Sequence, residues 1–354
     1  MQTPHFLIIR LSAIGDIVMA SGLIQSLKAQ YPDCQITWLA EPVGASLLKQ
    51  DERIDSVLVF DKPAIQKQMK QKHYLAGFRF FSSFVKQLRE TTYDYVIDTQ
   101  GLLKSSVLAG FAKSKHSVGF KSKEKSHWFV KQALVKQLSM QISSEYRQLA
   151  QYMDCPPEEF QLKLKTNDST KLQASKALSE LGIESDFICV APFTTRPQKH
   201  WIESHWIALI LQLRAKYSLP IVILGGPGDE PAAKAMLTNK GVHSLCGKTS
   251  LLGASEIINK AAFFVGVDTG LTHMAVMHKK PMVAIFGSTC PYLETDNPDC
   301  KVLYENLDCA PCKRRPTCGG EFTCMQNIKP ERIEHIASEY LDIHSRVIST
   351  SQEH

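Results

Sequence analysis

Long apolar runs are missing from this sequence. No run of about 18 or more apolar residues occurs in its 354 residues, so we expect no transmembrane helix. The apolar stretch from Phe6 to Ile9 is too short for the core of a secretion signal and leads into a polar loop. We therefore expect a cytoplasmic protein whose ten cysteines are thiols or metal ligands rather than disulfides.

Three motifs that define large enzyme classes are also absent. The first predicted strand is not followed by G-x-G-x-x-G, and no P-loop sequence G-x-x-x-x-G-K-[ST] occurs. No G-x-S-x-G elbow is present either. These absences count against dehydrogenases, P-loop kinases and α/β-hydrolases.

Positive charge is concentrated in the N-terminal half of the chain. Eight lysines lie between Lys104 and Lys136, against the single acid Glu124. A second basic stretch, from Lys62 to Arg79, overlaps the aromatic sequence from Leu75 to Phe81. Such stretches are either ordinary solvated surface or a surface that faces phosphates, on nucleic acid or on anionic lipid.

Short apolar strands alternate with helical patterns along the whole chain, which predicts an α/β protein with parallel sheets covered on both faces. The expected strands are His5–Arg10, Gln35–Leu39, Ser56–Phe60, Tyr95–Asp98, Ser117–Phe120, Phe187–Ala191, Ile221–Leu224, Phe263–Val267 and Met282–Phe286. The expected helices are Ile17–Gln30, Ser82–Glu90, Leu102–Ala112, 142–153, Ser169–Leu181, Trp206–Lys216, Pro231–Asn239, Ser250–Asn259, Leu271–Met277 and a last one from Pro330.

This alternation changes near residue 155, where two prolines and an irregular stretch separate two similar series of elements. We therefore expect two doubly wound domains, at 1–160 and 161–329, with a ligand cleft between them. A separate C-terminal helix is expected within 330–354.

The most informative segment runs from Phe264 to Met277. Its pattern predicts a buried strand, the tight turn Asp268–Gly270 and then a helix. Backbone N–H groups and the Thr269 hydroxyl at a helix N-terminus favour an anion. The segment thus predicts a site for a phosphate ester.

Asp16 has a similar place after the first strand. A carboxylate here is commonly a helix cap. It also follows the carboxyl end of a strand, where ligands bind in open α/β sheets, and Gly15 permits a special backbone conformation beside it. Asp16 is therefore either a cap or a base that accepts a proton from an attacking hydroxyl.

Two more loops follow strands in the C-terminal half. The loop from Thr194 to Trp201 carries hydroxyls and positive charge, and Lys199 is suited to neutralise charge on a departing diphosphate. The glycine-rich turn Gly225–Glu230 permits close backbone approach, and the Glu230 carboxylate is suited to bond a ribose or a base. Each loop alone can be interpreted as solvated surface. Several such turns would converge at one edge of the sheet, and together they favour a ligand site.

The cysteines are clustered near the C-terminus. Cys309, Cys312, Cys318 and Cys324 either hold a tetrahedral zinc or iron ion or remain free or transiently oxidised thiols. Their opening C-x-x-C is typical of metal sites, and the second pair is unusually spaced. Four thiolates leave no open position, so such an ion would be structural.

Four motifs together resemble the lipopolysaccharide heptosyltransferases of glycosyltransferase family 9. They are Ser12–Asp16, Asp98–Ser105, Thr194–Trp201 and Val267–His273. Residues 100–105 are most similar to heptosyltransferase I, whereas the cysteine segment is more similar to heptosyltransferase II. The acceptor therefore stays open between a Kdo sugar and the heptosylated inner core.

The resemblance implies a GT-B architecture, in which two Rossmann-like domains face each other across a cleft. The first domain would bind the acceptor, the second the nucleotide sugar, and the last helix would pack back on the first domain. The implied reaction transfers L-glycero-D-manno-heptose from ADP-heptose with inversion and requires no cofactor for catalysis. The implied place is the cytoplasmic face of the inner membrane, with Kdo-lipid A or the inner core and an anionic lipid surface as partners, and no nucleic acid.

The resemblance also assigns roles to residues of this sequence. Asp16 matches the general base, and Lys199 matches a lysine near the donor phosphates. The implied donor-binding residues are Thr194, Thr195, Lys199, Glu230, Asp268, Thr269, Gly270 and His273. The implied acceptor-binding residues are Ser12, Gly15, Gln100, Gly101 and Lys104.

Two alternatives remain. One is a family 9 transferase that uses another nucleotide sugar or acts on the second heptose, which a panel of donors and acceptors separates. The other is a metal-bearing nucleic-acid-binding protein built on the cysteines and lysines. That second alternative leaves Asp16, Lys199 and the turn at Asp268 without a role.

Overall fold

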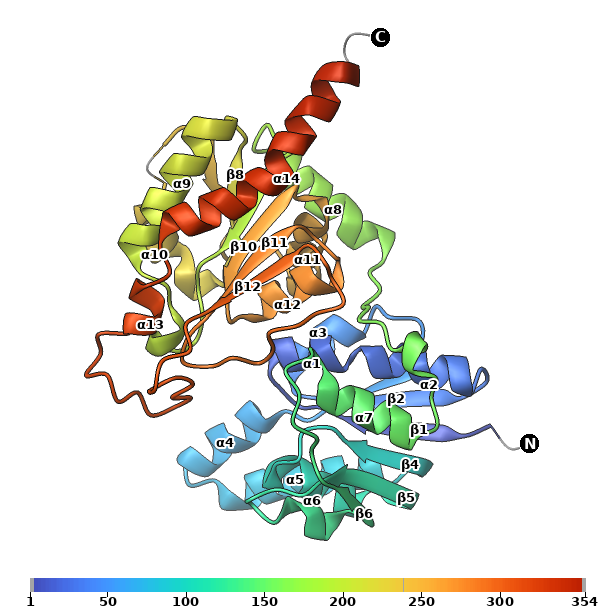
Figure 1. The fold of residues 1–354 in the computed structure, drawn as a ribbon. Helices are drawn as coiled ribbons and strands as arrows, with labels where there is room; N and C mark the ends of the chain where they lie inside the picture. The colour runs from blue at the N-terminus through green and yellow to red at the C-terminus, as the bar shows by residue number, and fades with distance from the viewer. Residues whose placement is uncertain (1–2, 238, 352–354) are drawn as a thin grey trace. The chain divides into compact units, whose positions relative to one another are not determined.

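The computed structural model describes residues 3–237 and 239–351, with side chains up to Asp342. The chain divides into two compact units, one formed by residues 1–139 with 143–166 and the other by 140–142 with 167–354. Each unit contains one six-stranded sheet with helices packed on it (Figure 1), and every strand pair is parallel. The predicted α/β class, with two doubly wound parallel sheets, is confirmed.

The first sheet has the strand order β3-β2-β1-β4-β5-β6. Its strands are β1 (His5–Ile9), β2 (Gln35–Ala40), β3 (Ser56–Val59), β4 (Thr92–Asp98), β5 (Lys113–Phe120) and β6 (Gln132–Leu134). In the centre of the sheet, Ile9 of β1 is in register with Leu39 of β2 and Asp98 of β4. The residues that follow these three strands therefore meet at one edge, where ligands bind in this architecture.

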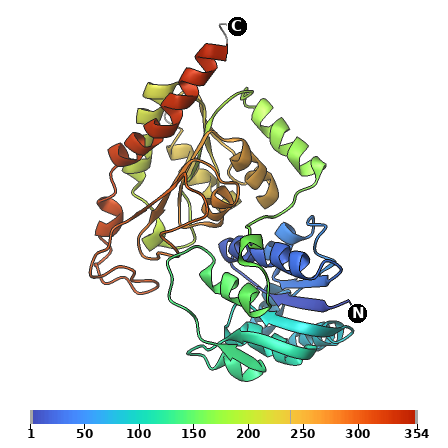
Figure 2. The same cartoon turned by 45° about the vertical axis from the view of Figure 1, so that its right-hand side comes forward.

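Helices cover both faces of the first sheet (Figure 2). They are α1 (Ile14–Ala20), α2 (Gly22–Gln30), α3 (Pro42–Leu48), α4 (Lys62–Lys70), α5 (Tyr74–Leu88), α6 (Leu103–Phe111) and α7 (Ser144–Tyr152), with the 3-10 turns η1 (Ser126–Phe129) and η2 (Pro157–Glu159). Alternate residues of β1 serve opposite faces. Leu7 and Ile9 pack with Phe84 of α5 and Leu108 of α6, whereas Phe6 contacts Tyr31 at the end of α2.

The second sheet has the order β12-β11-β10-β7-β8-β9. Its strands are β7 (Ile188–Ala191), β8 (Ile221–Ile223), β9 (Val242–Ser244), β10 (Phe263–Val267), β11 (Met282–Phe286) and β12 (Cys300–Tyr304). Its helices are α8 (Asp168–Ser179), α9 (Glu203–Tyr217), α10 (Glu230–Ala235), α11 (Leu251–Lys260), α12 (Gly270–Met277), α13 (Thr323–Gln326) and α14 (Pro330–Ser351), with η3 (Pro197–Lys199) and η4 (Pro227–Asp229).

A glycine in β10 lets α12 approach the sheet closely. A Cβ atom on Gly266 would lie 2.4 Å from the Thr272 hydroxyl oxygen. That hydroxyl donates to the carbonyl of Val267 at 2.5 Å. The contact fixes the first turn of α12 directly above the end of β10, which positions Asp268 and the helix N-terminus together.

Several element predictions were incomplete. The strands β6, β9 and β12 were not predicted, and neither were α3, α4 and α13. The first helix begins at Ile14 instead of Ile17 and is divided at Ser21 into α1 and α2, and α5 begins at Tyr74 instead of Ser82. Asp16 therefore lies inside the first helical turn, not in the loop before it.

The last helix packs on the second unit along its first half. Ile333, Ala337 and Leu341 are buried in the core that Trp206 and Phe263 also form, and α14 contacts α9, β10 and β11. Its expected packing on the N-terminal domain stays a prediction, as does the boundary between residues 160 and 161.

Candidate active site

The turn between β1 and α1 holds Asp16 by two contacts. The Asp16 carboxylate accepts the backbone N–H of Ala13 at 3.2 Å, in the manner of a residue in the first turn of a helix. It also forms an ion pair with the guanidinium of Arg10. Asp16 is therefore not the cap residue itself, which is Ala13, but it reaches back from the first turn to the N–H of that residue. One third of its side chain is exposed (33%).

Arg10 is the buried partner that orients Asp16. It follows β1, donates to the Thr99 carbonyl at 3.1 Å and lies over the Tyr146 ring at 5.7 Å. Burial opposes its charge, but the neighbouring Tyr146 and Asp16 raise the pKa of Arg10 overall. The charged guanidinium is thus held beside the Asp16 carboxylate and fixes its position.

The turn after β4 is built on a buried carboxylate. Asp98 accepts the backbone N–H groups of Gln100 and Gly101, both at 3.1 Å, and the hydroxyl of Ser106. Gly101 adopts the left-handed backbone conformation at φ 64° that favours glycine. Despite these bonds, burial raises the pKa of Asp98.

That turn approaches the β1–α1 turn from the neighbouring strand. The Gln100 side-chain oxygen accepts the backbone N–H of Leu11 at 3.1 Å. Lys104 Nζ lies 3.1 Å from the Ser12 hydroxyl and 3.1 Å from Glu41. Gly15 is buried inside α1. The acceptor-binding candidates of the first unit therefore lie around the same sheet edge as Asp16, and their contact with an acceptor stays a prediction.

The second unit assembles a charged cluster around Asp268. Lys199 Nζ pairs with Asp268 Oδ2 at 2.6 Å, and the Thr289 hydroxyl donates to the same oxygen. On the other side, His273 Nε2 lies 3.6 Å from Oδ1, and its Nδ1 lies 2.9 Å from the Tyr292 hydroxyl. Burial opposes the ionised form, but His273 and Lys199 together hold the pKa of Asp268 well below its usual range.

The loop after β7 reaches the same cluster. The Thr194 hydroxyl donates to the backbone carbonyl of Asp268 at 3.2 Å. Thr269 is the N-cap residue of α12 and Gly270 its first residue, so their N–H groups face the end of the helix where anions bind. The Lys199 ammonium, the N-terminus of α12 and the Thr194 hydroxyl thus lie together around Asp268, and the binding of an oxygen-rich anion here stays a prediction.

Two predicted donor residues lie outside this cluster in the described part of the chain. Thr195 is exposed, and Glu230 is exposed and pairs with Lys234 one turn further along α10 at 3.3 Å. Neither takes part in the contacts around Asp268. Their roles in donor binding stay predictions.

Comparison with known proteins decides the family. Residues 81–321, more than half of the chain, match glycosyltransferase family 9 (heptosyltransferase). The chain belongs to this family. It is therefore a glycosyltransferase, as the motifs around Asp16, Asp98, Lys199 and Asp268 suggested.

Individual known proteins align with most of the chain. Lipopolysaccharide heptosyltransferase 1 of Escherichia coli K12 is 25% identical over 299 residues, covering 81% of this chain and 89% of the relative. The structure of the E. coli ADP-heptose lipopolysaccharide heptosyltransferase II has the same fold, with a TM-score of 0.74 and 20% identity over 96% of this chain and 99% of the other. The iron-containing dodecameric glycosyltransferase TibC of enterotoxigenic E. coli H10407 has a TM-score of 0.57 and 15% identity over 96% of this chain and 76% of the other.

Several residues of the site were missed in the sequence. Arg10 stands directly after four apolar residues of a buried strand, and a lone cation there was the available signal. Thr289 follows β11 at its carboxyl end, like the loops that were identified. Glu41 directly follows β2 and so had the same signal, although its partner Lys104 is 63 residues away in sequence. Tyr292 lies further beyond β11, and only the fold shows its contact with His273.

The four clustered cysteines are not arranged as a metal site. Cys309 is exposed and Cys324 is buried. Burial raises the pKa of Cys324, and the thiols of Cys309, Cys312 and Cys318 raise it further. Within the described residues, however, no three His, Cys, Asp or Glu side chains are placed to hold a metal ion.

No helix in the described part of the chain combines the length and the apolar character that crossing a membrane requires. This finding agrees with the sequence, which lacks a long apolar run.

Proposed function

We propose that the protein transfers L-glycero-D-manno-heptose, with inversion, from ADP-heptose to the Kdo or heptose residues of the lipopolysaccharide inner core. Family membership supports the transfer of a heptose. The names of the relatives, which include heptosyltransferase 1 and an ADP-heptose heptosyltransferase II, support the donor and the acceptor class.

The Asp268 cluster is the observation that carries this proposal. ADP-heptose presents a diphosphate between its sugar and its nucleoside. Lys199 would supply a positive charge to this diphosphate, and α12 would supply its N-terminal N–H groups. Both lie beside Asp268 in a partly buried place. Thr194, Thr195 and Thr269 would donate hydroxyl hydrogen bonds, and Glu230 would hold the ribose.

Asp16 is the proposed base. An acceptor hydroxyl attacks the anomeric carbon of the heptose, and its oxygen forms the new glycosidic bond. The bond between that carbon and the diphosphate oxygen breaks, and ADP leaves with the electron pair. The hydroxyl proton passes to the Asp16 carboxylate. A single displacement of this kind inverts the anomeric centre.

Arg10 and Lys199 serve this step from the two units. Arg10 holds the Asp16 carboxylate in place before the attack, and the exposed part of that carboxylate is the proposed acceptor of the proton. Lys199 stabilises the negative charge that develops on the leaving ADP. Ser12, Gly15, Gln100, Gly101 and Lys104 are the proposed contacts to the acceptor.

We assign acceptor binding to the N-terminal domain and donor binding to the C-terminal domain. The lysine-rich segments of the N-terminal domain fit a lipid acceptor that carries phosphates. The enzyme would accordingly work as a peripheral protein at the cytoplasmic face of the inner membrane. No nucleic acid is part of the proposal.

A structural zinc or iron ion at Cys309, Cys312, Cys318 and Cys324 stays a prediction. The relative TibC is iron-containing, but the thiols of the described chain do not form a ligand set. Elemental analysis of the purified protein decides the matter. Stoichiometric zinc or iron that is lost in a Cys312→Ser, Cys318→Ser variant supports the ion, and metal-free active protein refutes it.

Mass spectrometry of the reaction products tests the proposed function. The purified protein is mixed with ADP-heptose, ADP-mannose or a UDP-hexosamine, and with either a Kdo-terminated or a heptose-terminated soluble acceptor. We expect a heptosylated product from ADP-heptose and from only one acceptor. A product from another donor alone would exclude ADP-heptose as the substrate.

A further inference from the structure

The helical hairpin of α4 and α5 exposes large apolar side chains beside positive charge. Leu75 and Phe78 on α5 are 79% and 68% exposed, and Tyr74 and Phe80 are also exposed. The opposite side of α5 is the one that packs on the sheet, through Phe84 and Leu88. The inner side of the hairpin is apolar because it packs on the sheet. Its tip is apolar too, although the side chains there are exposed and bury nothing in the folded unit.

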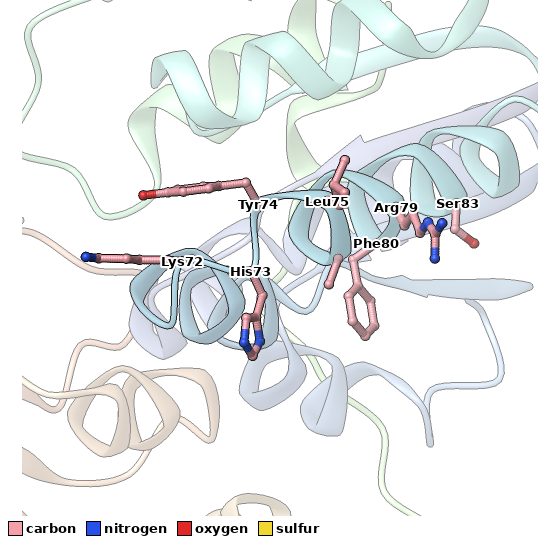
Figure 3. A pocket seen from close by; sticks show the side chains of 8 residues that line it. Lys72, His73, Tyr74, Leu75, Arg79, Phe80 and Ser83 are labelled. Carbon is pink, nitrogen blue, oxygen red and sulfur yellow. The ribbon is translucent and has the colours of Figure 1, made fainter.

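Figure 3 shows the tip of this hairpin. A shallow pocket is lined by Lys72, His73, Tyr74, Leu75, Ala76, Arg79, Phe80 and Ser83. Cationic and apolar side chains thus share one surface. Gly77 brings the two helices close together, because a Cβ atom there would lie 3.0 Å from the sulfur of Met69 on α4.

The charge of the hairpin has one sign. From Lys62 to Arg89 the sequence contains Lys62, Lys67, Lys70, Lys72, Arg79, Lys86 and Arg89, and no Asp or Glu. The segment therefore has no carboxylate of its own to pair with these cations. The combination of aromatic and basic residues on one amphipathic surface favours an anionic lipid interface over an acidic protein groove.

The elements next to α5 also expose an aromatic side chain. Phe81 of α5 contacts Phe111 of α6, with ring centroids 5.7 Å apart, and η1 packs on α6. Trp128 of η1 is 71% exposed, and the ammonium group of Lys125 lies 5.0 Å from its ring. The first unit thus carries a further exposed aromatic residue beside a lysine.

We propose that the tips of α4–α5 and η1 dock on an anionic bilayer, with Leu75, Phe78 and Trp128 inserted among the lipids and the lysines on their head groups. This inference rests on the proposed function, whose acceptor is a lipid, and it names the surface that reaches it. Aromatic side chains prefer the membrane interface, and two kinds of attraction are needed for stable docking.

Co-sedimentation with lipid vesicles tests the surface without any sugar donor. The whole protein is mixed with phosphatidylcholine vesicles, with or without phosphatidylglycerol. We expect binding only to the vesicles that contain phosphatidylglycerol, and weaker binding at high salt. The Leu75→Glu, Phe78→Glu double variant should bind at least about tenfold more weakly.

The matched control is Leu172→Glu, which changes an equally exposed leucine on α8 of the second unit. It should leave vesicle binding unchanged, and circular dichroism should show all variants folded. Undiminished vesicle binding by the double variant overturns the proposal. So does a loss of self-association in light scattering without a loss of vesicle binding, because the surface would then bind a second copy.

Transfer to a short soluble acceptor separates this inference from the proposed function. The double variant should transfer sugar to that acceptor at the normal rate, because Leu75 and Phe78 have no place in the reaction. If the unaltered protein fails to bind the vesicles but transfers heptose to the soluble acceptor, only the docking surface is wrong. If the unaltered protein binds the vesicles but transfers no heptose, only the proposed function is wrong.

Discussion

The ion pair between Lys199 and Asp268 offers the most quantitative test of the second unit. The two side chains are only 17% and 10% exposed, and their charged atoms lie 2.6 Å apart. In Asp268→Asn the lysine keeps its charge and loses its carboxylate. Because charged hydrogen bonds contribute about 1.5–3 kcal/mol and a broken buried pair costs about 3–5 kcal/mol, we expect a loss of about 2–4 kcal/mol.

This loss is measurable by urea and thermal unfolding. For a unit of this size, about 2–4 kcal/mol corresponds to a fall in melting temperature of about 4–16 °C. The double variant Asp268→Asn, Lys199→Met should be more stable than the sum of the two single losses predicts, since no unpaired charge remains. The control Lys234→Met removes the exposed pair with Glu230 and should change stability by less than about 0.5 kcal/mol.

The pH dependence gives a second reading of the same pair. Burial opposes ionisation, but His273 and Lys199 lower the pKa of Asp268 below its ordinary 3.8. Its stabilisation is therefore complete above that ordinary value and is lost as the pH falls through the lower pKa of the folded state. A loss below about 0.5 kcal/mol in Asp268→Asn, with strictly additive variants, would refute the buried pair.

Three further predictions concern single positions. Lys199→Ala should reduce kcat/KM for the nucleotide sugar by about a hundredfold or more, and unchanged donor kinetics would remove Lys199 from the site. Burial lowers the pKa of His278 from 6.5 to about 4. As the pH falls from 6.5 to 4, the unfolded chain takes up a proton at this histidine before the folded protein does, so the free energy of unfolding should fall by about 3 kcal/mol. The fall should be smaller in His278→Gln. Gly101→Ala and Gly182→Ala both place a side chain at positive φ and should each lower the free energy of unfolding by about 1 kcal/mol. Only Gly101→Ala should impair transfer. Equal activities of the two variants would show that Gly101 does not contact the acceptor.

The central strands were predictable because they are fully buried and therefore consist almost entirely of apolar residues. Both β10 and β11 are fully buried and begin and end at the predicted residues. The strands β6 and β9 escaped prediction because each has only three residues, at a sheet edge, where polar residues such as His243 are tolerated. Helix α5 was predicted too short, since Gly77 suggests a turn and in fact lets α4 and α5 pack closely.

The site was predictable where one loop carries its own chemistry. Thr194, Lys199, Asp268, Thr269 and His273 are near one another because they follow neighbouring parallel strands, a rule that the sequence pattern already contains. The partners of these groups were harder to find. Arg10 and Thr289 become recognisable only when the fold places them beside Asp16 and Asp268.

Transfer by the unaltered protein and by Asp16→Asn is the most direct test of the central claim. Both proteins are given ADP-heptose and the preferred acceptor, the heptosylated product is quantified by mass spectrometry, and ADP binding is measured by calorimetry. We expect the variant to bind ADP normally and to form product at least about a hundredfold more slowly. Product formation at the normal rate by Asp16→Asn would contradict the account, because the hydroxyl proton would then have another acceptor.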